Sequence, residues 1–463
     1  MRLKAAWQRL AALSLAAATC LSTIDGARAW ETTLHEFEQP EGWFLLAPLV
    51  ADADNTLFGL ASSGGNNGCF RQGCGTVFKI KPALVGNPFG ATATPTIIYR
   101  FQNKSDGSSP VAVIPDGQGG LYGSTQNGGV VTSECDSGCG MIFHLAPPAP
   151  GRTDWSYTVI YRFKGGRDGE FPVGRLVMDK QGALYGLTSN GGGGNACAAW
   201  AFQPSCGVVF QLQPMNAAKT VWRETVLYRF TGGRGGGIPN GELAIDPASG
   251  TLYGTTWYGG HNATTDCCGI VFRLTSPAQE GGDWRFTTLF RFSGADGSGP
   301  AGALALDKGV LYGATTFGGA FGHGAVFRLT PPASRDAPWI NTTLHSTSFA
   351  EGDRLESGVT RAADGTLYVV GHNGGNKTGA MPACAQHGCG TVFKLVPPAD
   401  PSGQWHYVSL HRFSGADGAG PSTAVTLLGH HVFGATWAGG DLAACKFFFL
   451  GTYGCGVVFD VGP

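Results

Sequence analysis

Charged residues are scarce in this chain. Only 14% of its 463 residues are Asp, Glu, Lys or Arg, against about 25% in typical domains, and the formal net charge is −1. Nucleic-acid binding requires clustered positive charge, and the sequence contains no basic stripe, so we expect no nucleic-acid partner. After Trp30, no apolar run is long enough to cross a membrane as a helix, so we expect no transmembrane segment once the leader is removed.

The motifs of several common enzyme classes are also missing. The chain has no G-x-S-x-G nucleophile elbow, no H-E-x-x-H zinc motif, no P-loop, no C-x-x-C-H haem site and no EF-hand loop. Its many glycines are not dinucleotide fingerprints, because no strand–turn–helix unit surrounds them. We therefore expect no cofactor and no metal site, and we expect an enzyme to be the less favoured class.

The N-terminus is typical of an export signal. Basic residues precede a short apolar run over 11–21, and Ala27-Arg28-Ala29 matches a signal-peptidase site. We predict a signal peptide over 1–29 and a single folded domain over 30–463, in a protein that is periplasmic or extracellular. A lipoprotein cut at Cys20 is the alternative, although Thr19 is a poor residue before a modified cysteine.

Cysteine usage supports export. Thirteen cysteines less Cys20 leave an even number, as expected for a disulfide framework. A four-thiolate zinc site is excluded because each repeat of the chain supplies only two thiols, and neighbouring repeats diverge. The adjacent Cys267 and Cys268 form either a strained vicinal bridge or two free thiols. The predicted pairs are Cys69–Cys74, Cys135–Cys139, Cys197–Cys206, Cys267–Cys268, Cys384–Cys389 and Cys445–Cys455.

One segment recurs seven times along the chain, with an apolar–aromatic start and a Gly-Gly end. The copies fall about 62 residues apart on average, and a period of this size marks a repeat architecture. The copies are LFGLASSGG from Leu57, LYGSTQNGG from Leu121, LYGLTSNGG from Leu184, LYGTTWYGG from Leu252, LYGATTFGG from Leu311, LYVVGHNGG from Leu367 and VFGATWAGG from Val432.

Each period contains four short segments with strand character. The segment WSYTVIYRF from Trp155 shows period-2 alternation, which predicts that its aromatic side chains share one face and pack between sheets. Four antiparallel strands in each of seven periods predict an all-β, seven-bladed β-propeller without helices. The last period lacks its fourth strand. We predict that the segment Trp30–Phe37 supplies it and closes the ring, which removes two exposed sheet edges.

The order LYG-x-x…GG, VF-x-L and W…Y-x-F resembles the kelch blade. It is more closely similar to the GloVer-type tandem repeats of secreted bacterial proteins, as in LYGTTWYGG…CGIVFRLTSP…LFRFSGADG. The resemblance covers essentially all of 30–463. It implies a secreted propeller, and the family carries no established activity that could be transferred to this chain.

Strand direction assigns the loops to the two ends of the ring. The links after Gly-Gly and the links between blades share one end, which carries the length variation and all twelve paired cysteines, so we expect function there. Aromatic side chains in these loops can stack on sugars or anchor a protein. The alternative is that they pack on neighbouring loops. The predicted ligand-binding residues are Trp200, Phe202, Trp257, Tyr258, Phe317, Trp437, Phe448 and Tyr453.

The charged residues fall into two groups: those that recur at the same position in several repeats and those that occur in one repeat only. An arginine recurs at one strand position in five blades, as in Arg162 and Arg229, and we predict that it bonds to the neighbouring blade. The residues that break the repeat are weak catalytic candidates for a polar pocket near the channel mouth, or else form salt bridges between blades. These residues are Arg175, Glu242, Asp353 and Glu356.

Three functions follow from these features. The first is a non-catalytic, secreted propeller that binds a glycan or protein partner through the aromatic, disulfide-stapled loops. The second is a carbohydrate-active enzyme, a polysaccharide lyase or glycoside hydrolase, and the third is a structural envelope protein. Two carboxylates, or an acid with His or Arg, converging at a cleft would favour the enzyme. Rings exposed over a shallow surface would favour binding.

Overall fold

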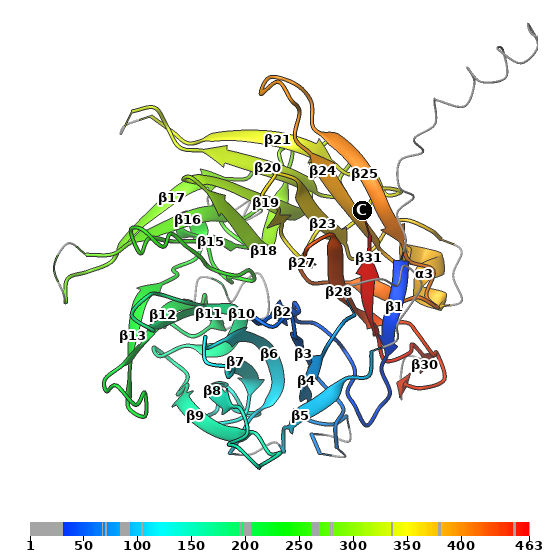
Figure 1. The fold of residues 1–463 in the computed structure, drawn as a ribbon. Helices are drawn as coiled ribbons and strands as arrows, with labels where there is room; N and C mark the ends of the chain where they lie inside the picture. The colour runs from blue at the N-terminus through cyan, green and yellow to red at the C-terminus, as the bar shows by residue number, and fades with distance from the viewer. Residues whose placement is uncertain are drawn as a thin grey trace, which may run out of the picture.

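The computed structural model confirms a seven-bladed β-propeller, in which each blade is a four-stranded antiparallel sheet (Figure 1). The chain runs around the ring once, and successive blades follow one another in sequence order. The structure describes residues 31–66, 68–69, 72–83, 93–102, 105–193, 197, 205–260, 268–277, 279, 281–334, 337–377, 381–447 and 451–462.

The first four blades are formed as follows. Blade one contains β2 (Val50–Ala51), β3 (Leu57–Ala61), β4 (Thr76–Ile80) and β5 (Thr96–Arg100). Blade two contains β6 (Ser108–Pro115), β7 (Leu121–Asn127), β8 (Met141–Ala146) and β9 (Ser156–Arg162). Blade three contains β10 (Glu170–Met178), β11 (Leu184–Asn190), β12 (Val208–Pro214) and β13 (Trp222–Arg229). Blade four contains β14 (Ala244–Ile245), β15 (Leu252–Thr256), β16 (Ile270–Thr275) and β17 (Arg285–Arg291).

The remaining blades complete the ring. Blade five contains β18 (Ser298–Asp307), β19 (Val310–Phe317), β20 (Ala325–Thr330) and β21 (Ile340–Ser346). Blade six contains β22 (Thr360–Arg361), β23 (Leu367–Gly371), β24 (Thr391–Val396) and β25 (His406–Arg412). Blade seven contains β26 (Ala419–Pro421) and β27 (Thr426–Leu428), β28 (His431–Ala438), β31 (Val457–Val461) and β1 (Glu31–Glu36). The loops add η1 (Gly233–Gly235), α3 (Pro382–His387), β29 (Lys446–Phe447) and β30 (Gly451–Thr452). The prediction of no helices is therefore wrong in the loops, where Pro382 begins a six-residue α-helix that is capped by Gly388.

Strands from the two ends of the chain close the ring. β1 pairs antiparallel with β31, with Glu31 opposite Val461 and Glu36 opposite Val457, and the two strands lie side by side in Figure 1. The amide of Phe37 continues the ladder by donating to the Gly456 carbonyl at 3.0 Å. The predicted closure by the N-terminal strand is therefore confirmed.

The glycine of the LYG segment is required by packing inside each blade. Gly254 lies directly opposite Phe272 on the next strand, and a Cβ at this glycine would lie 2.5 Å from the ring Cζ. The same contact recurs in blades one, two, three, five and seven. Blade six has Val369 opposite Phe393 instead. The ring of the third strand therefore lies flat over the second strand, where any larger residue must displace it.

The same rings join neighbouring blades. Phe230, at the end of the fourth strand of blade three, packs on Phe272 of blade four with 5.3 Å between ring centroids. Six such pairs exist, with centroid distances from 4.8 to 5.4 Å, and their rings are fully buried. Between blades five and six, Thr347 takes the place of the first ring and donates to the Gly324 carbonyl.

The predicted aromatic packing between sheets is confirmed, but the prediction that the rings of one fourth strand share a face is wrong. A register shift in the pairing of β8 with β9 turns the strand. Trp155 and Tyr157 therefore contact rings of blade one, whereas Phe163 contacts Phe210 of blade three.

A hydrogen-bonded bracket between a fourth-strand side chain and an aspartate fixes the links that leave blades one, two and six. In blade two, the Tyr161 hydroxyl donates to Asp168 Oδ1 at 2.6 Å, and the Lys164 amide donates to Asp168 Oδ2 at 2.7 Å. The repeated arginine crosses to the neighbouring blade as predicted, since Arg162 Nη2 donates to the Ser105 carbonyl and Arg229 Nε to the Arg167 carbonyl.

Glu224 of blade three lies against the bracket of blade two. Burial and, to a smaller extent, the Asp168 carboxylate raise the pKa of Glu224 to about 7, against the opposing effects of Arg229 and Lys164. Its Oε1 is buried without a protein partner. The folded protein therefore favours the protonated carboxyl at this position.

The first prediction concerns the glycine–phenylalanine contact. Gly254→Ala forces the Phe272 ring to move, and overpacking of this kind costs about 1–3 kcal/mol of unfolding free energy. In a Phe272→Leu background the ring Cζ is gone, so we expect the added methyl group to cost much less. Chemical denaturation of the four proteins measures the coupling, and purely additive effects would contradict the contact.

The second prediction concerns pH. Because Glu224 has a higher pKa folded than unfolded, the folded state binds its proton more tightly, and this stabilisation is lost as pH rises from about 4.5 through about 7. We expect Glu224→Gln to lose less Tm than wild type between pH 5 and 8. The control is Glu36→Gln, at an exposed carboxylate of β1. Parallel Tm curves for wild type and Glu224→Gln would rule the assignment out.

Candidate functional site

Two sets of loops meet at one end of the ring. Gly128, in the loop after the second strand of blade two, lies so close to Gly107 of the inter-blade link that a Cβ would be 2.5 Å from the Gly107 Cα. Gly191 and Gly439 make equivalent approaches to Gly169 and Gly418. We call this end the stapled face; it is formed by the described parts of loops 62–75, 128–140, 191–207, 259–269, 318–324, 374–390 and 439–456.

Disulfides close the loops of this face. Five of the predicted pairs are present in the structure, and their half-cystines are buried except Cys69, which is half-buried. Cys268 is also disulfide-bonded, whereas Cys267 lies outside the described residues. The confirmed pairs are Cys69–Cys74, Cys135–Cys139, Cys197–Cys206, Cys384–Cys389 and Cys445–Cys455.

Several of the predicted ligand-binding aromatics stack on their neighbours. Trp437 stacks on Phe44 with 5.5 Å between centroids and contacts Tyr453 at 5.9 Å. Trp257 stacks on Tyr258 at 6.2 Å. These rings are half-buried, as the alternative of packing between loops predicts. The predicted residues Trp200, Phe202 and Phe448 lie outside the described residues.

The loop of blade five presents its rings outward. Phe317 is 40% exposed and Phe321 is 62% exposed, so both offer apolar surface to a ligand. The guanidinium of Arg354 lies 5.9 Å from the Phe317 ring centroid, within the range of a cation–π contact. Among the described residues of the face, the most exposed rings therefore belong to its shortest loop.

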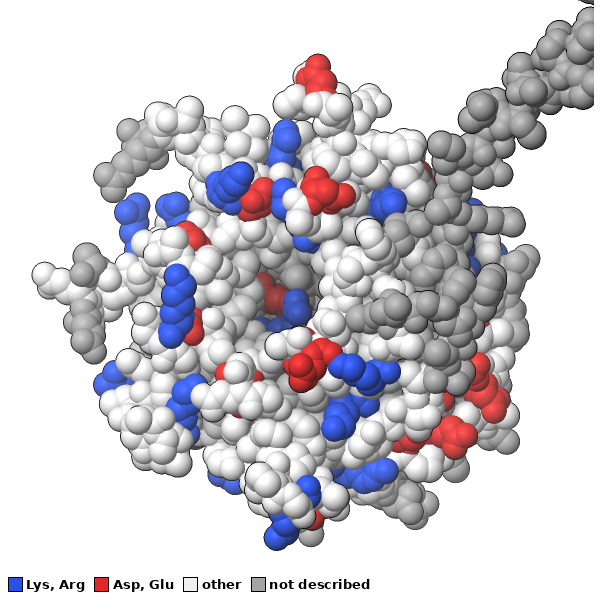
Figure 2. All heavy atoms as spheres, in the orientation of Figure 1, with Lys and Arg blue, Asp and Glu red and all other residues white. Residues whose placement is uncertain are grey.

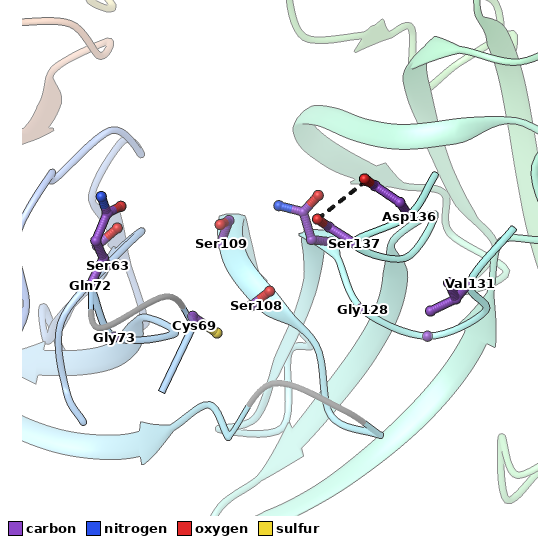
Figure 3. Close-up of a pocket in the computed structure, with 12 residues that line it drawn as sticks. Ser63, Cys69, Gln72, Gly73, Ser108, Ser109, Gly128, Val131, Asp136 and Ser137 are labelled. Atoms are coloured by element: carbon purple, nitrogen blue, oxygen red, sulfur yellow. Dashed lines mark hydrogen bonds between the residues drawn. The ribbon is translucent and has the colours of Figure 1, made fainter. Parts of the chain in front are cut away.

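A groove lies between the loops of blades one and two on the same face (Figure 3). It has a volume of about 380 Å³ and bears hydroxyl and amide side chains from Ser63, Gln72, Ser109 and Asn127. Val131, which is 65% exposed, supplies an apolar wall. Sequence reasoning missed this groove, because serine, asparagine and glutamine are ordinary loop residues and carry no distinctive spacing.

Two of the candidate carboxylates line one cavity on the ring axis. The cavity has a volume of about 210 Å³, and both Glu242 and Glu356 line it. Arg175 Nε donates to Glu242 Oε2 at 2.8 Å across blades three and four. Ser422 and Thr423 also line the cavity, and their buried hydroxyls have no protein partner. Figure 2 shows side chains of both charges inside the central hollow.

The other charged residues of blade six are paired locally. His323 Nδ1 lies 2.9 Å from Asp353 Oδ1, and Arg354 Nη2 lies 2.7 Å from Glu356 Oε1. Asp353 does not line the axial cavity. Burial lowers the pKa of His372, which stacks on Trp437 at 6.3 Å. The structure thus unites Arg175, Glu242 and Glu356 near the axis and separates Asp353 from them.

Comparison with known proteins gives the family. The chain matches the Gloeobacter/Verrucomicrobia repeat over residues 20–200 and 196–448. The fold and the repeat together define a propeller built from tandem repeats. The chain belongs to the Gloeobacter/Verrucomicrobia repeat family. No curated protein matches the chain.

Solved structures share the fold at low identity. The periplasmic gluconolactonase of Pseudomonas aeruginosa is 15% identical with a TM-score of 0.50, covering 88% of this chain and 99% of its own. The PQQ-bound aldose sugar dehydrogenase of Streptomyces coelicolor is 13% identical, with a TM-score of 0.42 and coverage of 75% and 93%. A luciferin-regenerating enzyme is 13% identical, with a TM-score of 0.43 and coverage of 94% and 95%. The likeness to the gluconolactonase bears on the fold alone. Among the described residues, no helix combines the length and apolarity needed for a membrane span.

The third prediction concerns the axial ion pair. Removing one partner by Arg175→Met or Glu242→Gln leaves the other group partly buried and unpaired, which costs about 1–3 kcal/mol of unfolding free energy. We expect the double variant Arg175→Met/Glu242→Gln to recover part of this loss, because no unpaired charge remains. Denaturant unfolding of the wild type, the two single variants and the double variant measures the coupling free energy between Arg175 and Glu242. A double variant as unstable as the sum of the singles would contradict the pairing.

Proposed function

We propose that this protein is exported and that its stapled face binds a neutral glycan without catalysing a reaction on it. The main support for this proposal is the groove between blades one and two. Its hydroxyl and amide side chains donate and accept hydrogen bonds in the way that sugar hydroxyls require. Its volume of about 380 Å³ falls within the range of ligand pockets, about 300–1,000 Å³.

The exposed rings extend the surface available to a longer ligand. Phe317 and Phe321 present apolar faces on which the C–H side of a sugar ring can lie, and Arg354 beside Phe317 can donate to ring hydroxyls. These rings and the groove lie on different blades of one face. A polymer that contacts both would gain affinity from two sites at once.

Export is supported by the disulfides. Five described cystines are consistent with an oxidising compartment, where disulfides persist. The predicted signal peptide over 1–29 lies outside the described residues. Periplasmic and extracellular destinations both fit these features.

A carbohydrate-active enzyme is the second candidate, and the axial cavity favours it. Glycoside hydrolysis uses a pair of carboxyl groups, and Glu242 and Glu356 line the same cavity. Each carboxylate is bound to an arginine, Glu242 to Arg175 and Glu356 to Arg354. A hydrolase needs a carboxyl group that is free to give its proton to the leaving group, and both candidates are already held in ion pairs, so this arrangement supports binding more than hydrolysis.

The fourth prediction tests glycan binding. A glycan array with the purified protein should identify one class of neutral glycan, and Gln72→Ala/Asn127→Ala should weaken its binding about tenfold through two lost hydrogen bonds. Ser402→Ala is the matched control, because Ser402 is exposed in the link between β24 and β25, at the opposite end of the ring.

The outcomes separate the candidates. Turnover of a polysaccharide that Glu242→Gln abolishes would establish the enzyme and contradict our proposal. Binding of a protein but of no glycan would contradict the ligand class. If the protein neither binds a glycan or protein nor degrades a polysaccharide, our proposal is contradicted and the third hypothesis, a structural envelope protein, is favoured.

A further inference from the structure

Three metal-ligating side chains converge where the ring closes. Glu31 comes from β1, His411 from β25, and Asp417 from the link between β25 and β26. One ligand atom from each lies within 4.8 Å of the others, and His411 Nε2 lies 2.9 Å from Asp417 Oδ2. The side chains of His411 and Asp417 are 17% and 24% exposed, so the cluster is largely enclosed between blades six and seven.

Equivalent positions in the other blades show what is special about this cluster. The register aligns Glu31, opposite Val461 in β31, with Glu224, opposite Leu212 in β12. Likewise His411, opposite Val392, aligns with Tyr161 of the blade-two bracket, opposite Ile142. The junction of blades two and three therefore carries Tyr161, Asp168 and Glu224, which is the same arrangement with a tyrosine in place of the histidine.

The remaining junctions carry fewer ligating groups. Between blades one and two, the positions are Tyr99, Asp106 and Tyr157, whose hydroxyl donates to the Asp106 carbonyl. Between blades five and six, His345 faces Glu351, and its ring stacks on Tyr407 at 5.2 Å. Among the described residues, three metal-ligating side chains gather only at the junction of blades six and seven.

His411 and Asp417 form the bracket of blade six, so a structural role accounts for both of them. Glu31 is not part of this bracket. The carboxylates of Glu31 and Asp417 place two negative charges beside one imidazole, that of His411. The Glu31 carboxylate accepts a long hydrogen bond from the Thr33 hydroxyl, at 3.3 Å. A bound cation would supply the missing positive charge.

We propose that Glu31, His411 and Asp417 bind a divalent first-row cation, of which Zn²⁺ and Mn²⁺ are the best candidates. One imidazole nitrogen and two carboxylates suit these ions and provide two negative charges. With bonds of about 2.0–2.2 Å, neighbouring ligand atoms lie about 3 Å apart on an octahedral ion such as Mn²⁺ and about 3.4 Å apart on tetrahedral Zn²⁺. The 2.9 Å between Nε2 and Oδ2 therefore matches the octahedral arrangement, and Zn²⁺ requires the two side chains to separate by about 0.5 Å.

The surroundings of Asp417 favour this geometry. Its Oδ1 accepts hydrogen bonds from the Ser414 amide at 2.7 Å and the Ser414 hydroxyl at 2.9 Å, so the carboxylate is held with Oδ2 directed at His411. Such outer contacts orient ligands in metal sites. Because Glu31 lies on β1, the ion would tie the strand that closes the ring to the preceding blade.

The test uses tag-free protein stripped with a chelator and titrated with Zn²⁺ or Mn²⁺ by calorimetry. We expect one site per chain and a rise in Tm of about 3 °C at a free concentration near 100 times Kd. Glu31→Gln and His411→Tyr should each remove the site. The His411→Tyr variant recreates the tyrosine–aspartate bracket of blade two, so its fold is supported by the protein's own repeat.

The reverse change makes the test independent of loss of folding. Tyr161→His places an imidazole beside Asp168 and Glu224, so we expect a second site and two ions per chain. Unchanged zinc binding in His411→Tyr would overturn the proposal, as would a single site in Tyr161→His. Failure of wild type to bind either ion would overturn it as well. None of these results depends on glycan binding.

Discussion

The packing of one phenylalanine per blade sets the geometry of the whole ring. The ring of Phe272 covers Gly254 within its own sheet and contacts Phe230 of the preceding blade. Six junctions repeat this three-way contact, and their rings are among the largest fully buried side chains of the protein. Because each ring fixes both its sheet and the next one, the spacing and tilt of the blades follow from a single motif. The closure of the ring by β1 depends on the same contact, since Phe37 packs on Phe78.

In each blade, the strands form the uniform core, whereas the loops of the stapled face supply the residues that are candidates for function. The strands that carry the repeat have little freedom to vary, whereas the loops of the stapled face differ in length and composition and are held by their own disulfides. Functional candidates are accordingly found where the repeat is broken. The groove of blades one and two, the exposed rings of blade five and the charged axial cavity are all departures from sevenfold symmetry. Their diversity on one rigid support is what a binding protein requires.

Much of the fold could be predicted from the sequence, because the same strand and turn patterns recur in seven repeats, and each repeat supports the interpretation of the others. The cysteine pairs and the missing fourth strand of blade seven each indicated a feature that the structure contains. The alternation in WSYTVIYRF correctly indicated a strand, but not which face each ring takes, because a bulge in β9 turns the strand between Tyr157 and Phe163. The site was harder to predict. Arg175 and Glu242 were recognised as departures, but their 2.8 Å contact depends on how blades meet at the axis. Glu31 and His411 are separated by most of the chain, and only ring closure brings them together.

Closure by β1 is the central claim, because the core, the single face and the ion site all require it. Amide hydrogen exchange followed by mass spectrometry measures it directly. We expect the amides of β1 and β31 to exchange as slowly as those of the paired strands β12 and β13 inside blade three. Rapid exchange throughout β1, with protection retained in β12 and β13, would show an open ring and contradict closure by β1.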